Sequence, residues 1–109
     1  MILEQQDTTT PYHLGDGLIV RFATVADIEP LAQFNGRIHT SEGFNEFIAQ
    51  WTREFASPSH PTCGPDNVTV VEDTNTGQIV SSICLIPQTW TFDGIPLPVG
   101  RPEAVGTDP

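Results

Sequence analysis

Residues 67–86 read NVTVVEDTNTGQIVSSICLI. The first part alternates valine with threonine or a second valine, and residues 78–86 are again rich in β-branched side chains, a pattern typical of strands. Residues 73–77, DTNTG, lie between the two runs and favour a turn. The stretch therefore predicts a β-hairpin, which places an antiparallel sheet in the C-terminal half.

A further strand is predicted after this hairpin. Pro87 is expected to interrupt the second strand, after which residues 89–92 resume the alternation. Asp93-Gly94 is a dipeptide preferred in two-residue turns, so a third strand should run back through Val99 to Thr107. Three prolines restrict that strand to bulged or partly unpaired positions: Pro96, Pro98 and Pro102.

Upstream of the hairpin, the pattern predicts a strand at residues 18–24, while residues 1–14 lack a period and are expected to form a flexible arm. Thr24 and Asp27 have the spacing of a helix capping box, so a regular helix should begin near residue 27 with Pro30 in its first turn. A second helix is predicted with Ser41 as its cap. Its aromatic stripe is interpreted as core packing rather than a substrate surface: Phe44, Phe47, Ile48, Trp51 and Phe55.

The predicted elements follow the order β-α-α-β-β-β, which indicates an α+β fold with two helices packed on a mainly antiparallel sheet. A chain of 109 residues favours a single domain. The loop at residues 57–66, which carries three prolines, is expected to connect layers of that domain rather than two domains.

Charge excludes some classes of partner. Fourteen acidic residues face four arginines and no lysine, which gives a net charge of −10. Binding to nucleic acid or to an anionic membrane surface is therefore not expected, because both need clustered cations. The acidic surface suits a basic amine substrate or partner, and it is equally explained as a solubilising surface.

Cysteine usage and the opening residues bear on compartment. The first seven residues have neither a basic start nor a sustained apolar run, so no secretory signal is expected. Cys63 and Cys84 are therefore expected to be reduced thiols in a cytoplasmic protein, although an exported chain that had lost its signal would look the same. His60 and Cys63 have a metal-like spacing but lack partner ligands, so no metal site is predicted.

Three segments together resemble the GCN5-related N-acetyltransferase (GNAT) family. Residues 20–27, VRFATVAD, resemble the first strand and helix start of that family, and residues 70–80 resemble its second and third strands. Residues 105–109, VGTDP, resemble the end of its fourth strand. The resemblance implies that residues 15–109 are the N-terminal, substrate-side half of an acyl-CoA N-acyltransferase domain, with a partial GNAT fold. The sequence stops before the family's pyrophosphate-binding glycine loop, so this portion is expected to be inactive alone.

The resemblance also implies a mechanism and a set of site residues. The complete enzyme would transfer an acetyl group from acetyl-CoA to an amine, and the backbone of Val105, Gly106 and Thr107 would pair with the pantetheine arm and polarise the thioester carbonyl. Glu103 is the candidate base, although its register differs from the position where some family members carry a glutamate, and it is equally an exposed strand carboxylate. Candidates to border the amine site, with helix-surface or packing roles as the alternative, are Phe34, His39, Glu42 and Glu46.

Two other functions stay open at this stage. The chain is alternatively a non-catalytic α+β interaction module that pairs with a partner through its exposed C-terminal strand. It is also compatible with a small ligand-binding domain that uses the Trp51 and Trp90 surfaces. Because the last strand is expected to have an unpaired edge, homodimers through that strand are predicted.

Overall fold

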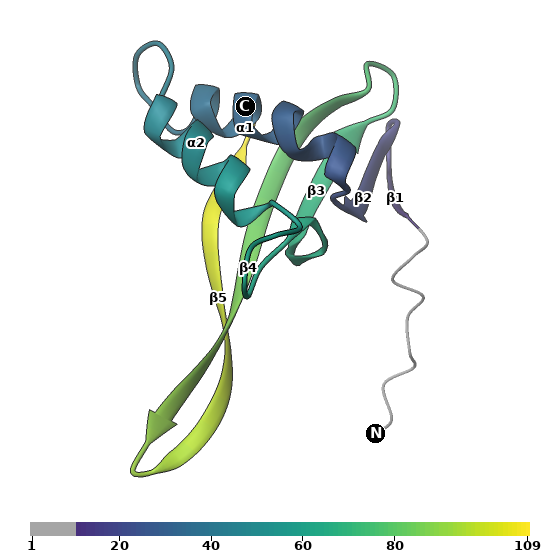
Figure 1. The fold of residues 1–109 in the computed structure, drawn as a ribbon. Helices are drawn as coiled ribbons and strands as arrows, with labels where there is room; N and C mark the ends of the chain where they lie inside the picture. The colour runs from purple at the N-terminus through teal and green to yellow at the C-terminus, as the bar shows by residue number, and fades with distance from the viewer. Residues whose placement is uncertain (1–10) are drawn as a thin grey trace.

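The computed structural model describes residues 11–109 (Figure 1). Five strands form one antiparallel sheet in the order β1-β2-β3-β4-β5, and two helices lie on one of its faces. This confirms the predicted α+β class, with one strand more than expected. The elements are β1 (Tyr12–Gly15), β2 (Leu18–Phe22), η1 (Val25–Asp27), α1 (Ile28–Ile38), α2 (Glu46–Phe55), η2 (Pro65–Asn67), β3 (Val68–Asp73), β4 (Gln78–Phe92) and β5 (Ile95–Thr107).

Strand β1 overlaps residues 1–14, which were expected to form an arm. Residues 1–10 of that arm are outside the described residues, whereas Tyr12–Gly15 pairs with β2. The two strands are joined by Asp16 and Gly17, which both have positive φ (55° and 80°), as the commonest two-residue hairpin turn requires. The Asp-Gly turn signal was present in the sequence, and the short strand before it was missed.

Arg21 of β2 fixes the start of α1. Its guanidinium donates two hydrogen bonds to the Asp27 carboxylate, at 2.7 and 2.9 Å, and a third to Glu72 of β3 at 2.9 Å. Asp27 in turn accepts a hydrogen bond from the Thr24 backbone N–H at 2.7 Å, which is the carboxylate half of the predicted capping box. The regular helix starts at Ile28 with Pro30 in its first turn, as predicted.

Helix α2 begins later than predicted. Its cap is Asn45, whose side chain accepts a hydrogen bond from the Ile48 backbone N–H at 3.1 Å, so the assignment of Ser41 as the cap was wrong. Phe44 therefore precedes the helix, and its ring packs against Gly36 of α1. Phe47 is 77% exposed, so the aromatic stripe is only partly core.

The core lies between the helices and the sheet. Its buried side chains come from both layers: Leu31, Phe34, Phe55, Val68, Val70 and Cys84. A hydrogen bond from buried Asn35 to buried Thr52, at 3.0 Å, joins the two helices inside the core. At the surface Arg53 makes two hydrogen bonds to Glu29, at 2.8 and 2.9 Å, so the two helices are held together on both sides.

Strands β4 and β5 continue beyond the helices as a two-stranded arm (Figure 1). Contrary to the prediction, Pro87 does not interrupt β4. Strand β3 pairs with β4 only as far as Cys84, so Pro87 lies where β4 has a neighbour on one side and its missing N–H breaks no central ladder. The arm ends at Asp93 and Gly94, which have positive φ (51° and 78°), as predicted for this turn.

Neither helix in the described part of the chain combines the length and the apolar character needed to cross a bilayer. The C-terminal residues lie beside α1 (Figure 1), where the Arg37 guanidinium is 3.4 Å from the Asp108 carboxylate.

We predict that the Asp27→Asn substitution lowers the free energy of unfolding by about 2 kcal/mol, because it removes a charged partner from half-buried Arg21. Urea denaturation at pH 7 measures this change. Glu29→Gln is the matched control: it breaks an ion pair to Arg53 at the surface, where solvent screens the charges, and should change stability much less.

The same variant predicts a change in pH dependence. The hydrogen bonds from Arg21 lower the pKa of Asp27, so this carboxylate stabilises the fold above its unfolded pKa of about 4 and loses that contribution as the pH falls through its folded pKa. A paired carboxylate titrates between about pH 5 and about pH 2. Over this range the Asp27→Asn variant should therefore lose less stability than the unchanged chain. Equal losses in both proteins would contradict the role given to Asp27.

Candidate functional site

Strand β5 contains a bulge close to its C-terminal end. Ser82 pairs with Gly106, but Cys84 pairs with Glu103, so two steps along β4 correspond to three steps along β5. Ala104 lies in this extra step with a φ of 49°, a left-handed conformation that a non-glycine residue rarely adopts. Along a regular strand, every second residue directs its backbone N–H group to the neighbouring strand. The bulge shifts this alternation by one residue, so the set of N–H groups that faces β4 changes from one side of the bulge to the other.

This phase determines which backbone groups face the open edge of β5. The Asp108 N–H donates a hydrogen bond to the Val80 carbonyl of β4 at 2.8 Å. Because successive residues of a strand direct their N–H groups to opposite sides, the N–H and C=O groups of Thr107 and Val105 point away from β4. Within residues 11–109, no strand lies on that side of β5.

The rest of the β5 edge has few free donors. Pro96, Pro98 and Pro102 occupy alternate positions of the arm, and proline has no N–H group. A strand that approached this part of the edge would find carbonyl acceptors but almost no donors. The edge is therefore open to a hydrogen-bonding partner mainly at Val105 and Thr107.

Gly106 allows α1 to approach this end of β5 closely. A Cβ atom on Gly106 would lie 2.8 Å from Cγ2 of Ile38 and 3.3 Å from Nε2 of His39. Any larger residue would push the end of α1 and the end of β5 apart. Glycine thus fixes the spacing between the helix terminus and the two outward-facing amides.

A cavity of about 330 Å³ lies between α2 and β5 beside the bulge. Glu103, Ala104 and Val105 form its β5 side, and His39 closes the end next to α1. The opposite wall comes from three apolar residues of α2: Phe47, Ile48 and Trp51. The Trp51 ring is held edge-on against Phe55, with ring centroids 4.5 Å apart.

Two polar side chains, Glu103 and His39, border this cavity. The Glu103 carboxylate is 3.0 Å from Nε of Arg101, an ion pair that holds the carboxylate at the cavity's rim. The Nε2 atom of His39 is buried and has no hydrogen-bond partner among the described residues. This nitrogen packs against Gly106, where a Cβ atom would lie 3.3 Å away, so it is shielded from the cavity.

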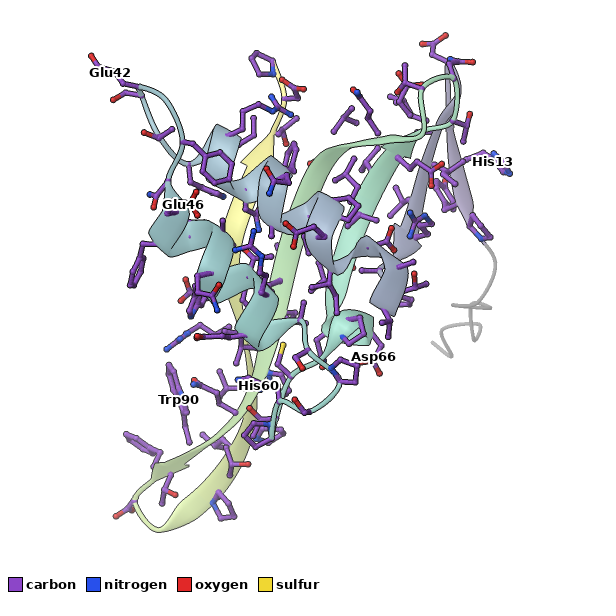
Figure 2. The ribbon with its side chains drawn as sticks, turned by 45° about the horizontal axis from the view of Figure 1, so that its top comes forward. His13, Glu42, Glu46, His60, Asp66 and Trp90 are labelled. Atoms are coloured by element: carbon purple, nitrogen blue, oxygen red, sulfur yellow. The ribbon has the colours of Figure 1, made fainter. Side chains whose placement is uncertain are left out.

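The structure brings together only some of the predicted site residues. Glu103, His39 and Val105 line one cavity, with Gly106 and Thr107 following along β5. Phe34 is buried in the core, and its small exposed part faces a different cavity of about 640 Å³, where Arg37 lies 5.6 Å from the centre of its ring. Glu42 and Glu46 line neither cavity and lie at the loop before α2 and at its first residue (Figure 2).

The α2 wall was not predicted as part of the site. Helical spacing in the sequence placed Phe47, Ile48 and Trp51 on one face, and that face was interpreted as core. Whether these side chains belong to the core or to a cavity wall depends on how far β5 extends beneath α2. That extent depends on the bulge, and the sequence of the helix alone does not show it. Trp51 was also named in the ligand-binding alternative, but its proposed companion Trp90 lies on the arm and does not line this cavity (Figure 2).

The His60–Cys63 segment has a structural role in the loop. His60 Nδ1 accepts hydrogen bonds from the backbone N–H groups of Thr62 and Cys63, at 3.2 and 2.9 Å. Within residues 11–109, no three His, Cys, Asp or Glu side chains gather closely enough to bind a metal ion.

A comparison of the chain with models of known protein families found no match, and a search of curated protein sequences found none either. The function proposed for the chain therefore depends on the geometry of β5 and its cavity, read together with the motifs in the sequence.

We predict that Gly106→Ala destabilises the fold by about 1–3 kcal/mol, because the new methyl group collides with Ile38 and His39. Gly100→Ala on the same strand is the matched control. Its methyl group would meet only the side chain of Leu85, which is 49% exposed and free to move, so a smaller loss is expected. Thermal unfolding of both variants tests this, and equal losses would argue against a close contact at Gly106.

Proposed function

We propose that this chain is the N-terminal, substrate-side portion of an acetyl-CoA-dependent N-acetyltransferase of the cytoplasm, which acetylates an amine. The observation that carries the proposal is the end of β5, where two outward-facing backbone amides lie next to a cavity containing a carboxylate. The motifs at residues 20–27, 70–80 and 105–109, which resemble the GNAT family, support the same function.

The residues near the bulge suit the pantetheine arm of acetyl-CoA. That arm carries amide groups, which pair with a strand edge as a neighbouring strand would, and Val105 and Thr107 offer both a donor and an acceptor. The Thr107 hydroxyl lies 2.8 Å from the Ser81 hydroxyl of β4, so the side chain is held on β4 rather than over the open edge. When bound, acetyl-CoA supplies the acetyl group as a thioester.

The described residues do not suit the diphosphate of the same molecule. Arg37 is the cation near the end of β5, and it already pairs with Asp108. Asp108 itself places a negative charge at this end of the strand, which disfavours a second anion. We therefore propose that the diphosphate is bound by a glycine loop outside these residues, and that this portion alone does not catalyse the transfer.

Glu103 is the proposed proton acceptor. An alkylammonium group must lose a proton before its nitrogen can attack a carbonyl, and a carboxylate at the cavity's rim is placed to take that proton directly or through one water molecule. Arg101 lies beside the carboxylate, with its Nε 3.0 Å away in an exposed ion pair. The His39 ring borders the same cavity, but its Nε2 is buried against Gly106 and is not exposed to a bound amine.

The cavity walls indicate the kind of amine. Phe47, Ile48 and Trp51 present an apolar surface opposite Glu103, and a volume of about 330 Å³ admits a small molecule or one side chain of a peptide. An amine with an apolar body would bury that body against α2 and direct its ammonium group to Glu103. The net charge of −10 attracts such cations at long range.

The second candidate function is an interaction module that pairs through the C-terminal strand, including pairing with a second copy of the chain. The open edge at Val105 and Thr107 favours it, because outward-facing amides also accept a strand. The prolines at 96, 98 and 102 restrict such pairing to the last few residues of β5. Sedimentation at high concentration tests pairing with a second copy: dimers that form without acetyl-CoA would support it, and a strict monomer would remove the homodimer.

We predict that Thr107→Pro weakens acetyl-CoA binding by about tenfold, because it removes one outward-facing N–H without removing a backbone hydrogen bond to β4. Thr107→Val is the matched control, since valine also lacks the hydroxyl group but keeps the N–H, and it should bind as the unchanged chain does. An NMR titration followed at the Gly106 amide measures both. Equal weakening in the two variants would assign the effect to the Ser81 contact instead.

We predict that Glu103→Gln lowers turnover by about 100-fold or more in the enzyme that contains this portion, because glutamine cannot accept the proton. The affinity for acetyl-CoA should stay unchanged, which a turnover assay by release of the CoA thiol and a separate binding measurement would show. Unchanged turnover would leave Glu103 as a surface carboxylate of β5.

A further inference from the structure

The two cysteines of the chain meet in the structure, although they are 21 residues apart in the sequence. Cys63 lies in the loop between α2 and η2, and Cys84 lies in the middle of β4. Their sulfur atoms are 3.7 Å apart, and both thiols are free. Cys84 is 1% exposed, whereas Cys63 is half-buried and packs against the edge of the core.

The surroundings of this pair suit a small movement of one sulfur. A disulfide has a sulfur–sulfur distance of about 2 Å, so the pair must close by less than 2 Å. Cys84 is fixed by the ladder with β3 and β5, where it pairs with Val68 and Glu103. Cys63 lies outside any strand or helix, in a loop whose turn is formed by hydrogen bonds to His60, so rotation of its side chain breaks no ladder.

We propose that Cys63 and Cys84 are a reversible oxidation site, which a peroxide converts to an intramolecular disulfide that ties the 57–66 loop to β4. In the first step, the Cys63 sulfur attacks hydrogen peroxide, the O–O bond breaks, and a sulfenic acid and one water form. In the second step, the Cys84 sulfur attacks the Cys63 sulfur and releases a second water. Two thiols lose two electrons and two protons, and the peroxide is reduced to two waters.

The order of the two steps follows from exposure. Only Cys63 is accessible enough to meet the oxidant, because Cys84 is enclosed by the core. Burial also raises the pKa of Cys84, with the neighbouring Cys63 thiol adding to the effect, so Cys84 is the poorer nucleophile toward a reagent in solution. Cys84 therefore acts as the resolving thiol, and the 3.7 Å distance compensates for its low thiolate fraction.

The disulfide would restrain the end of α2. The loop from Ser57 follows α2 directly, and η2 leads into β3, so a bond at Cys63 would attach this connection to the sheet. The link closes a loop of about 20 residues, a length for which disulfides usually stabilise the folded state. Oxidation should therefore raise the thermal midpoint by about 10 °C, the shift expected for a chain of this size.

The test is oxidation of the purified full chain with one equivalent of hydrogen peroxide, followed by alkylation in denaturant and mass spectrometry. The expected result is a monomer that has lost two hydrogen atoms in mass, takes up no alkylating reagent, and melts at the higher temperature until dithiothreitol restores both thiols. A product with both thiols still alkylated, a disulfide between two chains, or a disulfide that lowers the thermal midpoint would overturn the proposal.

Two variants assign the roles of the thiols. In Cys84→Ala, peroxide should leave a sulfenic acid on Cys63 that dimedone traps, because the resolving thiol is missing. In Cys63→Ser, Cys84 should react at least tenfold more slowly with peroxide than Cys63 does in the other variant. Rapid trapping on Cys84 would contradict the order of steps. If the Cys84→Ala core does not fold, the Cys63→Ser variant and the unchanged chain still decide the proposal.

Discussion

The extra residue in β5 at Ala104 determines how this end of the molecule is arranged. Because β5 is one residue longer than its partner between Glu103 and Gly106, Glu103 lies beside the cavity while the N–H groups of Val105 and Thr107 point to the open edge. Without the extra residue, the alternation of backbone N–H groups in the proline-bearing arm would continue unchanged to the end of β5. The left-handed backbone conformation costs a non-glycine residue such as Ala104 about 1–3 kcal/mol. The paired segments of β5 on either side hold Ala104 in this conformation.

Helix α1 connects this end of β5 to the opposite side of the sheet. At its start, the Arg21 guanidinium joins β2, Asp27 and Glu72 of β3 in one hydrogen-bonded group. At its end, Ile38 and His39 pack against Gly106. The helix therefore spans the sheet from β2 to β5 with both ends fixed. Helix α2, joined to it through Asn35 and Thr52, forms the apolar wall of the cavity at a set distance from β5.

The sequence was sufficient where the signal is local. Alternation identified β3, and a run rich in β-branched residues identified β2. Thr24 and Asp27 located the start of α1, and Asp93-Gly94 located the hairpin turn that leads into β5. Features that depend on distant contacts were missed. Pro87 suggests a break until the pairing of β4 with β3 is known to end at Cys84. Phe47 suggests core packing until α2 is known to overhang the cavity, and the bulge at Ala104 has no signal in its own residues. Of the proposed amine-site residues, only His39 lines the cavity together with Glu103. Glu42 lies in a loop, and helical spacing in the sequence does not locate a loop residue.

Amide hydrogen exchange of residues 104–108, measured by NMR with and without acetyl-CoA, tests the central claim most directly. The account predicts that the N–H groups of Val105 and Thr107 exchange rapidly in the free chain, that Asp108, bonded to Val80, exchanges slowly, and that acetyl-CoA slows Val105 and Thr107 selectively. Slow exchange of Val105 and Thr107 in the free monomer, or fast exchange that acetyl-CoA leaves unchanged, would contradict the claim that this strand edge binds the pantetheine arm.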